Sequence, residues 1–373
     1  MSLTVLKNGL VFTCDCSFRK TDVTVSDGII ASLSEAQGAD NIIDCSDCYV
    51  LPGLTDIHLH GCAGHDLSEA SDAALKAMCE YEYKRGVTSF CPAVMTLPDS
   101  MITNTVSAVS SYFPEAGTPA ADIVGINLEG PFVSAEKCGA QNVDHISEPS
   151  SEKLLAWQKA ARGLIKLVTI APETAGAVKC ISACSGSFHF SLGHSSCGYD
   201  TAAAAFAAGA DHVTHLFNAM QPFHHRDTGI IGAAFDTPGI FAELICDGVH
   251  VSPSAVRAAF RLFGDDRIVL ISDSMEAAGM PDGEYALGGQ RVFKRGNRAV
   301  LSDGTLAGSV TDLYGCMLKA VEFGIPLESA VKAATCNPCR SIGIFDRYGS
   351  IEPGKKARFF VLRKSDLSIK TVI

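Results

Sequence analysis

Short apolar runs alternate with amphipathic stretches along the middle of the chain. Eight of these runs have the length and character of buried strands: GLTDIHLH, VTSFCPAVM, DIVGINLEG, IKLVTIAPE, FHFSLGHS, HVTHLF, FAELICDGVH and RIVLISDS. Helical stretches separate most of them, at 71–85, 150–162, 201–208 and 253–263. Because eight strands alternating with helices close a parallel barrel, this pattern predicts an α/β fold, a (β/α)8 TIM-like barrel over residues 52–343.

The two ends of the chain follow a different pattern, in which apolar and polar residues alternate within short segments. Residues 1–51 contain such segments, and the turn dipeptides Asn8-Gly9 and Asp27-Gly28 predict hairpins between them. Residues 344–373 add two or three strands of the same kind. We therefore predict one small β-sandwich domain built from both termini.

Composition limits the classes of function that are open to the chain. It has 373 residues, of which 47% are hydrophobic and 19% charged, and a formal net charge of −11. This charge argues against general binding to nucleic acid or to a membrane surface, since both attract basic proteins. The N-terminus has no signal-peptide pattern, and no apolar run reaches the roughly 18 residues of a membrane span. We expect a cytoplasmic protein, which also suits its 15 scattered cysteines.

Two C-x-x-C pairs, Cys45/Cys48 and Cys336/Cys339, raise the alternative of a cysteine zinc site. Ribbon-type zinc sites usually separate their two pairs by roughly 15–20 residues. These pairs stand at opposite ends of the sequence. We therefore expect buried free thiols at all four positions.

Ionisable residues gather at the ends of the predicted strands, where barrel enzymes carry their chemistry. In chain order they are His58 and His60, Glu129, His194, His215, Asp247 and His250, and Asp273. Any one such histidine is more often a hydrogen-bonded core or surface residue. Several imidazoles and carboxylates at one mouth, without cysteine, instead indicate a catalytic divalent metal such as Zn²⁺ or Fe²⁺.

Asp273, in the segment ISDSM, is the candidate proton carrier. A divalent ion lowers the pKa of bound water toward about 7. A carboxylate beside that water can take its proton and deliver it to a leaving nitrogen. The alternative role for Asp273 is a helix N-cap, which aspartate fills well.

Seven segments carry longer motifs: PGLTDIHLHG at 52–61, NLEGPF at 127–132, LGHS at 192–195, HLFNAM at 215–220, DGVH at 247–250, ISDS at 271–274 and TLAGS at 305–309. In order and spacing they resemble the amidohydrolase superfamily and, within it, the N-acetylglucosamine-6-phosphate deacetylase family. The resemblance spans nearly the whole chain. It implies metal-dependent hydrolysis of N-acetyl-D-glucosamine 6-phosphate to D-glucosamine 6-phosphate and acetate.

The resemblance also implies a role for each matching residue. Glu129, His194 and His215 would hold a primary ion, and His58 with His60 a second, so one or two ions per subunit are expected. Asp273 would be the catalytic base. Substrate contacts would come from Ala140, Gln141, Asn218, Ala219, Arg226, Asp247, His250, Leu306, Ala307 and Gly308. The resemblance further implies that Arg226 contacts the phosphate in the neighbouring site of a homodimer. Arginine suits a phosphate because its planar fork donates two parallel hydrogen bonds.

One position departs from the family pattern. Many members carry Gly-Ala-His or Gly-Thr-His after the Glu-Gly-Pro segment, whereas this chain has Gln141 in place of the histidine. Gln141 can donate a hydrogen bond to the acetyl carbonyl or the sugar, but it cannot carry a proton. Polarisation of the carbonyl would then depend more on metal, which favours two ions.

Two other functions stay open. The chain could deacetylate galactosamine 6-phosphate derivatives or hydrolyse another N-acyl substrate, because epimeric sugars differ by one hydroxyl group. It could also be a barrel that lost its chemistry and serves as a non-catalytic subunit. Loss of chemistry usually removes a metal ligand or the base, and this sequence has both.

Overall fold

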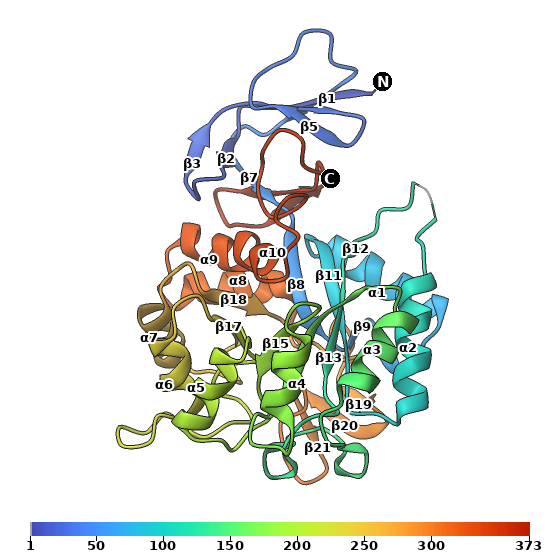
Figure 1. Ribbon diagram of the computed structural model, residues 1–373. Helices are drawn as coiled ribbons and strands as arrows, with labels where there is room; N and C mark the ends of the chain where they lie inside the picture. Colours follow the sequence, from blue (N-terminus) through green and yellow to red (C-terminus); the bar gives the residue numbers. More distant parts are fainter. Residues whose placement is uncertain (1, 116) are drawn as a thin grey trace.

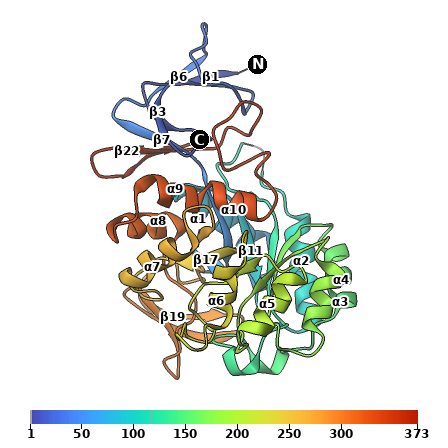
Figure 2. The ribbon, with the colours of Figure 1, turned by 60° about the vertical axis from the view of Figure 1, so that its left-hand side comes forward.

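Eight parallel strands form the centre of the molecule, and helices surround them (Figures 1 and 2). The computed structural model describes residues 2–115 and 117–373. In chain order the barrel strands are β8 (Leu54–Leu59), β11 (Val87–Val94), β13 (Ile126–Glu129), β14 (Ile165–Ile170), β15 (His189–Leu192), β16 (His212–Val213), β17 (Phe241–Ile245) and β18 (Ile268–Ile271). Each strand pairs with the next one in this order. The predicted (β/α)8 architecture is confirmed.

The circle closes through the segments that follow the first and last strands. The backbone N–H of Asp273, just beyond β18, donates to the carbonyl of His58 at 2.9 Å. The N–H of His60 donates to the carbonyl of Ser274 at 2.7 Å. Closure of the barrel therefore brings the first and eighth strand ends together, 215 residues apart in sequence between His58 and Asp273.

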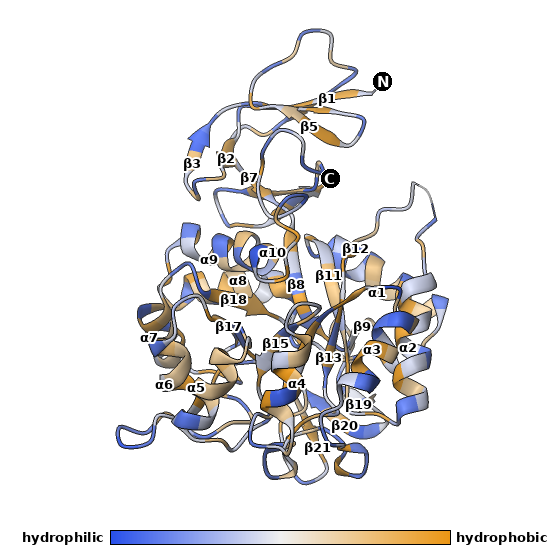
Figure 3. Cartoon of the chain, in the orientation of Figure 1, coloured by the Kyte–Doolittle hydropathy of each residue, from blue (hydrophilic) through white to orange (hydrophobic). Residues whose placement is uncertain are grey.

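Ten α-helices of the described residues cover the outside of the barrel. They are α1 (Asp72–Lys84), α2 (Asp99–Ser111), α3 (Ser151–Ala160), α4 (Ala177–Cys184), α5 (Tyr199–Ala207), α6 (Gly229–Asp236), α7 (Pro253–Phe263), α8 (Leu313–Glu322), α9 (Leu327–Ala334) and α10 (Cys336–Ser341). The four predicted helical stretches correspond to α1, α3, α5 and α7. Figure 3 shows apolar strands at the centre and hydrophilic segments on the outer helices. No helix in the described part of the chain is long and apolar enough to cross a membrane.

Both termini contribute to a separate β-structure at one end of the barrel (Figure 1). One sheet has the order β5-β4-β1-β6 and the other β23-β22-β7-β2-β3. Their strands are β1 (Leu3–Lys7), β2 (Leu10–Phe12), β3 (Phe18–Lys20), β4 (Val23–Ser26), β5 (Ile29–Ser32), β6 (Asn41–Asp44), β7 (Cys48–Pro52), β22 (Phe359–Arg363) and β23 (Ile369–Val372). Antiparallel pairing of β7 with β22 joins the two ends of the chain. Apolar residues of both sheets, among them Leu6, Val25, Val50 and Val361, share one buried core. The exact domain limits stay a prediction.

One of the two predicted hairpins is wrong. Asp27-Gly28 does connect the antiparallel strands β4 and β5. Asn8-Gly9 lies between β1 and β2, but these strands belong to different sheets. Asn8 has the left-handed φ of 68° that suits a turn, so the local signal was sound. The chain uses this turn to pass from one sheet to the other.

A three-stranded antiparallel sheet follows β18 and was not predicted. It consists of β19 (Gly283–Leu287), β20 (Gln290–Arg295) and β21 (Arg298–Leu301). In Figure 1 it lies at the end of the barrel opposite the terminal β-structure. Leu287 and Val292 pack there against Met95 and Ala307 in a small buried cluster. The sheet therefore covers the carboxyl ends of the barrel strands.

The four cysteines of the C-x-x-C pairs are buried free thiols, which agrees with the prediction. Cys45 and Cys48 belong to the terminal β-structure, whereas Cys336 and Cys339 lie in α10 against the barrel.

Candidate metal centre and active site

Three side chains from three of the strands converge at the carboxyl end of the barrel. Glu129 ends β13, His194 follows β15, and His215 follows β16. Glu129 Oε1 lies 3.0 Å from His194 Nε2 and 2.9 Å from His215 Nε2. The two Nε2 atoms are 3.0 Å apart, and all three residues are buried. We call these three residues the first ligand group.

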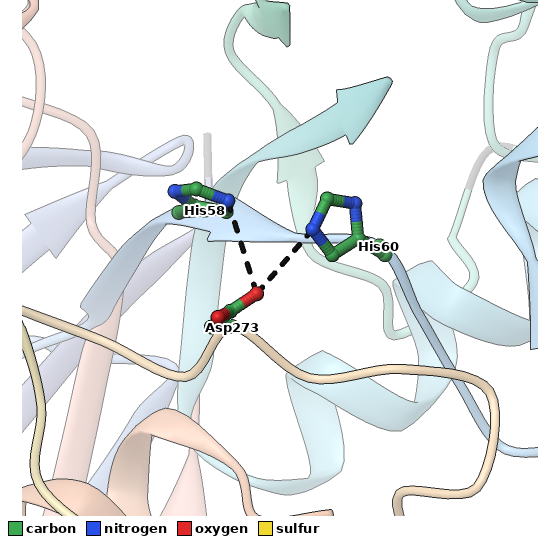
Figure 4. Close-up of side chains that lie close together, drawn as sticks. All are labelled: His58, His60 and Asp273. Atoms are coloured by element: carbon green, nitrogen blue, oxygen red, sulfur yellow. Dashed lines mark ion pairs between the residues drawn. The ribbon is translucent and has the colours of Figure 1, made fainter. Parts of the chain in front are cut away.

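His58, His60 and Asp273 form a second ligand group beside the first. Asp273 Oδ1 lies 3.8 Å from His58 Nε2 and 3.3 Å from His60 Nε2. Figure 4 shows both rings directed toward this carboxylate. Glu129 lies between the groups, because its Oε1 is 3.3 Å from His58 Nε2 and its Oε2 is 3.1 Å from His60 Nε2. Two adjacent ligand groups therefore share one carboxylate.

Hydrogen bonds on the far side of the rings set which nitrogen of three histidines faces the site. Each Nδ1 atom lies 3.0 Å from an acceptor: His58 from Glu243 Oε2, His60 from Ala93 O, and His194 from Lys137 O. A carbonyl or a carboxylate only accepts, so each Nδ1 carries the proton. The Nε2 atoms are then left to bind a metal, the arrangement that metal-ligating histidines usually show.

The donor set fits a divalent ion for a second reason. Within the described residues, His58 Nε2 is buried and has no hydrogen-bond partner. The Nε2 atoms of His194 and His215 face each other and one Glu129 oxygen at nearly equal distances. Three acceptors directed at one point are poorly satisfied by a single shared proton. Neutral imidazoles with a carboxylate instead match the ligands of Zn²⁺ or Fe²⁺.

The buried charges shift one another's pKa values. Burial by itself raises the pKa of Glu129, but the charge of His58 and the contacts with His194 bring that pKa well below its usual range. Burial also opposes ionisation of Asp273, yet its hydrogen bond with His60 lowers the pKa of the carboxyl. Burial alone lowers the pKa of His60, but the contacts of its ring with Asp273 and Glu129 raise that pKa to about 10. Protons and metal ions therefore compete for the same atoms.

Three of the site residues have a left-handed backbone. The φ angles are 46° at His194, 27° at His215 and 48° at Asp273. Such conformations cost of order 1–3 kcal/mol in non-glycine residues and persist where the surrounding structure fixes them. Asp273 is fixed on both sides, since its N–H donates to His58 and its carbonyl accepts from the N–H of Ser309 at 2.6 Å. The alternative of a helix N-cap is wrong, because no described helix starts at Asp273.

A cavity of about 220 Å³ opens beside the two ligand groups. Five of the predicted metal and proton-transfer residues line it, namely His60, Glu129, His194, His215 and Asp273. Seven of the predicted substrate-binding residues line it too: Ala140, Gln141, Asn218, Ala219, His250, Leu306 and Gly308. Leu287 of β19 and Met95, which sequence reasoning missed, complete its apolar wall.

Three predicted substrate-binding residues do not line the cavity. Asp247 lies behind His250, whose Nδ1 is 2.8 Å from Asp247 Oδ2, so it holds the ring rather than facing the cavity. Ala307 is fully buried. Arg226 is exposed on the long loop between β16 and α6, which projects from the lower left of Figure 1. Its guanidinium contacts His225 of the same loop.

Sequence reasoning also missed Glu243. This glutamate lies inside β17, is fully buried, and accepts the hydrogen bond from His58 Nδ1. Its signal was a carboxylate in the middle of the apolar run FAELIC. A carboxylate that stays buried needs a partner, and His58 of β8, two strands away around the closed barrel, supplies it.

Comparisons with known proteins agree with this geometry. Residues 49–373 match the Amidohydrolase family. N-acetylglucosamine-6-phosphate deacetylase of Bacillus subtilis is 37% identical to the chain, over 94% of the chain and 90% of that protein. N-acetylgalactosamine-6-phosphate deacetylase of Escherichia coli O157:H7 is 32% identical, over 91% of the chain and 89% of that protein.

A solved structure covers the whole molecule. It is an aspartate-to-alanine mutant of N-acetyl-D-glucosamine-6-phosphate deacetylase from Mycobacterium smegmatis, in complex with N-acetyl-D-glucosamine-6-phosphate. It superposes with a TM-score of 0.92 and 30% identity, over 100% of this chain and 98% of that chain. With its barrel and its two ligand groups, the chain belongs to the amidohydrolase family, among the relatives of the N-acetylglucosamine-6-phosphate deacetylases.

Proposed function

We propose that this protein hydrolyses N-acetyl-D-glucosamine 6-phosphate to D-glucosamine 6-phosphate and acetate, with a divalent metal as cofactor. The observation that carries the proposal is the position of the two ligand groups, Asp273 among them, beside one cavity, in a chain that is 37% identical to a deacetylase of this name. A non-catalytic role is disfavoured, because the ligand atoms and the base are all in place.

The metal is Zn²⁺ or Fe²⁺ in this proposal. The first ligand group would hold the primary ion, and His58 with His60 would hold a second one with Glu129 between them. When bound, such an ion lowers the pKa of water and polarises the acyl carbonyl. The imidazole and carboxylate donors support these metals over Mg²⁺ or Ca²⁺, which prefer oxygen ligands.

Asp273 is the proton carrier in this reaction. Its lowered pKa leaves it ionised at neutral pH, as a base must be. It accepts the proton of the attacking water and returns it to the nitrogen as the C–N bond breaks. Its fixed backbone and the neighbouring His60 keep the carboxylate directed at the cavity, so little reorganisation is needed during proton transfer.

The substrate is bound by the rest of the cavity. His250, which Asp247 orients through Nδ1, presents Nε2 as a polar contact for the sugar. Asn218 and the backbone of Ala219 supply amide donors, and Leu306 with Gly308 close over the ring. Arg226 would reach the phosphate bound in the other subunit of a homodimer, because its loop projects from its own barrel. Cytoplasmic location stays a prediction.

A substrate panel tests the proposal. Purified protein loaded with Zn²⁺ or Fe²⁺ is incubated with N-acetylglucosamine 6-phosphate, its unphosphorylated form, and N-acetylgalactosamine 6-phosphate, while acetate release is measured. We expect rapid release from the first compound and at least about tenfold lower kcat/KM without the phosphate, since charge-assisted hydrogen bonds contribute roughly 1.5–3 kcal/mol. Absence of acetate release from every compound would refute the proposed function.

The galacto epimer is the second candidate substrate. The Escherichia coli relative named for it shares 32% identity over 91% of the chain, which is close to the value for several glucosamine enzymes. A kcat/KM for the galacto compound above that for the gluco compound would reassign the substrate without changing the chemistry.

A further inference from the structure

The side chain of Gln141 is held between two fixed partners. Its Oε1 accepts a hydrogen bond from the backbone N–H of Thr96 at 2.7 Å, just beyond β11. Its Nε2 donates to Glu129 Oε2 at 2.5 Å. Because the N–H of Thr96 can only donate, the amide has one possible orientation, with its NH₂ group facing the carboxylate. The side chain is buried, with 4% of the residue exposed.

This contact distinguishes the two oxygens of Glu129. Oε1 faces the imidazoles of the first ligand group, at 2.9 and 3.0 Å, and lies farther from His58 Nε2, at 3.3 Å. Oε2 faces His60 at 3.1 Å and accepts the hydrogen bond from Gln141. Rotation of the carboxylate would break that hydrogen bond, so Gln141 holds Oε1 toward His194 and His215 and Oε2 toward His60. The hydrogen bond also occupies one of the lone pairs that Oε2 could offer to an ion.

We propose that Gln141 is a positioning residue that directs Glu129 Oε1 toward the first ligand group and weakens Oε2 as a ligand for a second ion. The inference rests on the proposed metal-dependent function. The protein then binds one ion tightly at Glu129, His194 and His215, and a second ion more weakly at the His58–His60 side. This is the opposite of the sequence-based expectation that Gln141 favours two ions.

The competing role for Gln141 is a direct contact with the substrate, as expected from its position in the motif. The residue does line the cavity. However, its carbonyl oxygen and one N–H are already used by Thr96 and Glu129, so a single N–H is left for a sugar or acetyl oxygen. The two roles predict different measurements, because a positioning residue acts on metal affinity and a substrate contact acts on KM.

Gln141→Met tests the inference, since it keeps the length of the side chain and removes both hydrogen bonds. Wild type, Gln141→Met and the matched control Asn142→Ala are equilibrated with Zn²⁺ in graded chelator buffers, and bound metal is counted by mass spectrometry. We expect the first ion to bind about 10- to 100-fold more weakly in Gln141→Met, as for other residues that orient metal ligands. The control should match wild type. At saturating metal, the KM of Gln141→Met should stay within about twofold of wild type. This KM measurement is the only part of the experiment that requires the proposed activity.

An unchanged metal affinity would overturn the inference, and so would a KM raised tenfold at normal metal content. Gln141→Ala removes the same hydrogen bonds with a smaller side chain and serves if Gln141→Met does not fold. Thermal unfolding before metal is added checks the fold of each variant. The metal titration does not require turnover, so it tests Gln141 even if the wild-type protein hydrolyses none of the substrates. Failure of the proposed function is thus distinguishable from failure of this inference.

Discussion

Two clusters of histidine and carboxylate occupy opposite ends of the barrel, and they differ in what their nitrogen atoms face. In the first ligand group, two Nε2 atoms and one carboxylate oxygen meet at one point, 2.9–3.0 Å apart. At the amino ends of β15 and β16, Asp211 instead accepts from His189 Nδ1 at 2.6 Å and from His212 Nδ1 at 2.7 Å, on separate oxygens. In the first arrangement two ring nitrogens and a carboxylate oxygen are directed at one point, whereas in the second both carboxylate oxygens are taken up by hydrogen bonds.

The comparison shows that residue types alone do not define a metal site. Both clusters contain two histidines and one acid within ligand distance. What distinguishes them is where the Nδ1 protons go, since at the carboxyl end backbone carbonyls and Glu243 take those of His58, His60 and His194. At the amino end the carboxylate itself takes those protons. We therefore assign metal binding to one end of the barrel and a bracing role between two strands to the other.

The largest expected difference between the two ends is catalytic. Asp273→Asn should reduce kcat by about 10²- to 10⁴-fold, because it removes the proton carrier while keeping the shape of the side chain. Asp211→Asn, the matched change at the other end, should leave kcat within about twofold. Acetate release with metal content measured in parallel checks both. Asp273→Asn with more than a tenth of wild-type activity would remove Asp273 from the mechanism.

A second difference should appear in metal content. His215→Ala removes a ligand of the first group, so we expect its affinity for Zn²⁺ to fall by at least about 100-fold, more than the loss of an orienting residue. His189→Ala should keep the wild-type stoichiometry and affinity. Dialysis against a chelator followed by metal analysis makes the measurement. If His189→Ala lost an ion that wild type holds, the bracing role assigned to the amino-end cluster would be wrong.

The smallest expected difference concerns stability and pH. Burial alone raises the pKa of Asp211, but the charge of His212 and the hydrogen bonds from both histidines bring it well below its usual range. Because the pKa of Asp211 is lower in the folded than in the unfolded protein, the ionised carboxylate stabilises the fold. This stabilisation is present above the unfolded-state pKa of about 3.9 and is lost as the pH falls toward the folded-state pKa. Because the side chain is 38% exposed, solvent screening limits the effect to about 1 kcal/mol or less.

Asp211→Asn is therefore expected to unfold at a lower denaturant concentration than wild type at pH 7. The gap should stay constant down to about pH 5 and then narrow between about pH 4 and pH 2. Denaturant melts at a series of pH values measure this gap. A gap that widens as the pH falls would mean that Asp211 is not stabilised as a charged group.

The sequence was sufficient for the barrel and for the candidate ligands at the strand ends. Alternation of apolar runs with helical stretches predicted all eight strands, because burial on both faces of a parallel strand leaves a continuous apolar signature. His58, Glu129, His194, His215 and Asp273 were visible because each interrupts such a signature just where the strand ends. The Asn8-Gly9 hairpin failed, since a turn dipeptide fixes local φ and ψ but not which sheet receives the next strand.

Only the tertiary structure decided which atoms face one another. Barrel closure brings Asp273 beside His58, and it brings Glu243 of β17 to the Nδ1 of that histidine. The segment that follows β13 folds back to place Gln141 against Glu129, and the turn after β17 sets Asp247 behind His250. The identity of the ligands is a property of the sequence, because it depends on residue type at strand ends. The direction of their lone pairs is not, because partners far apart in the chain set it.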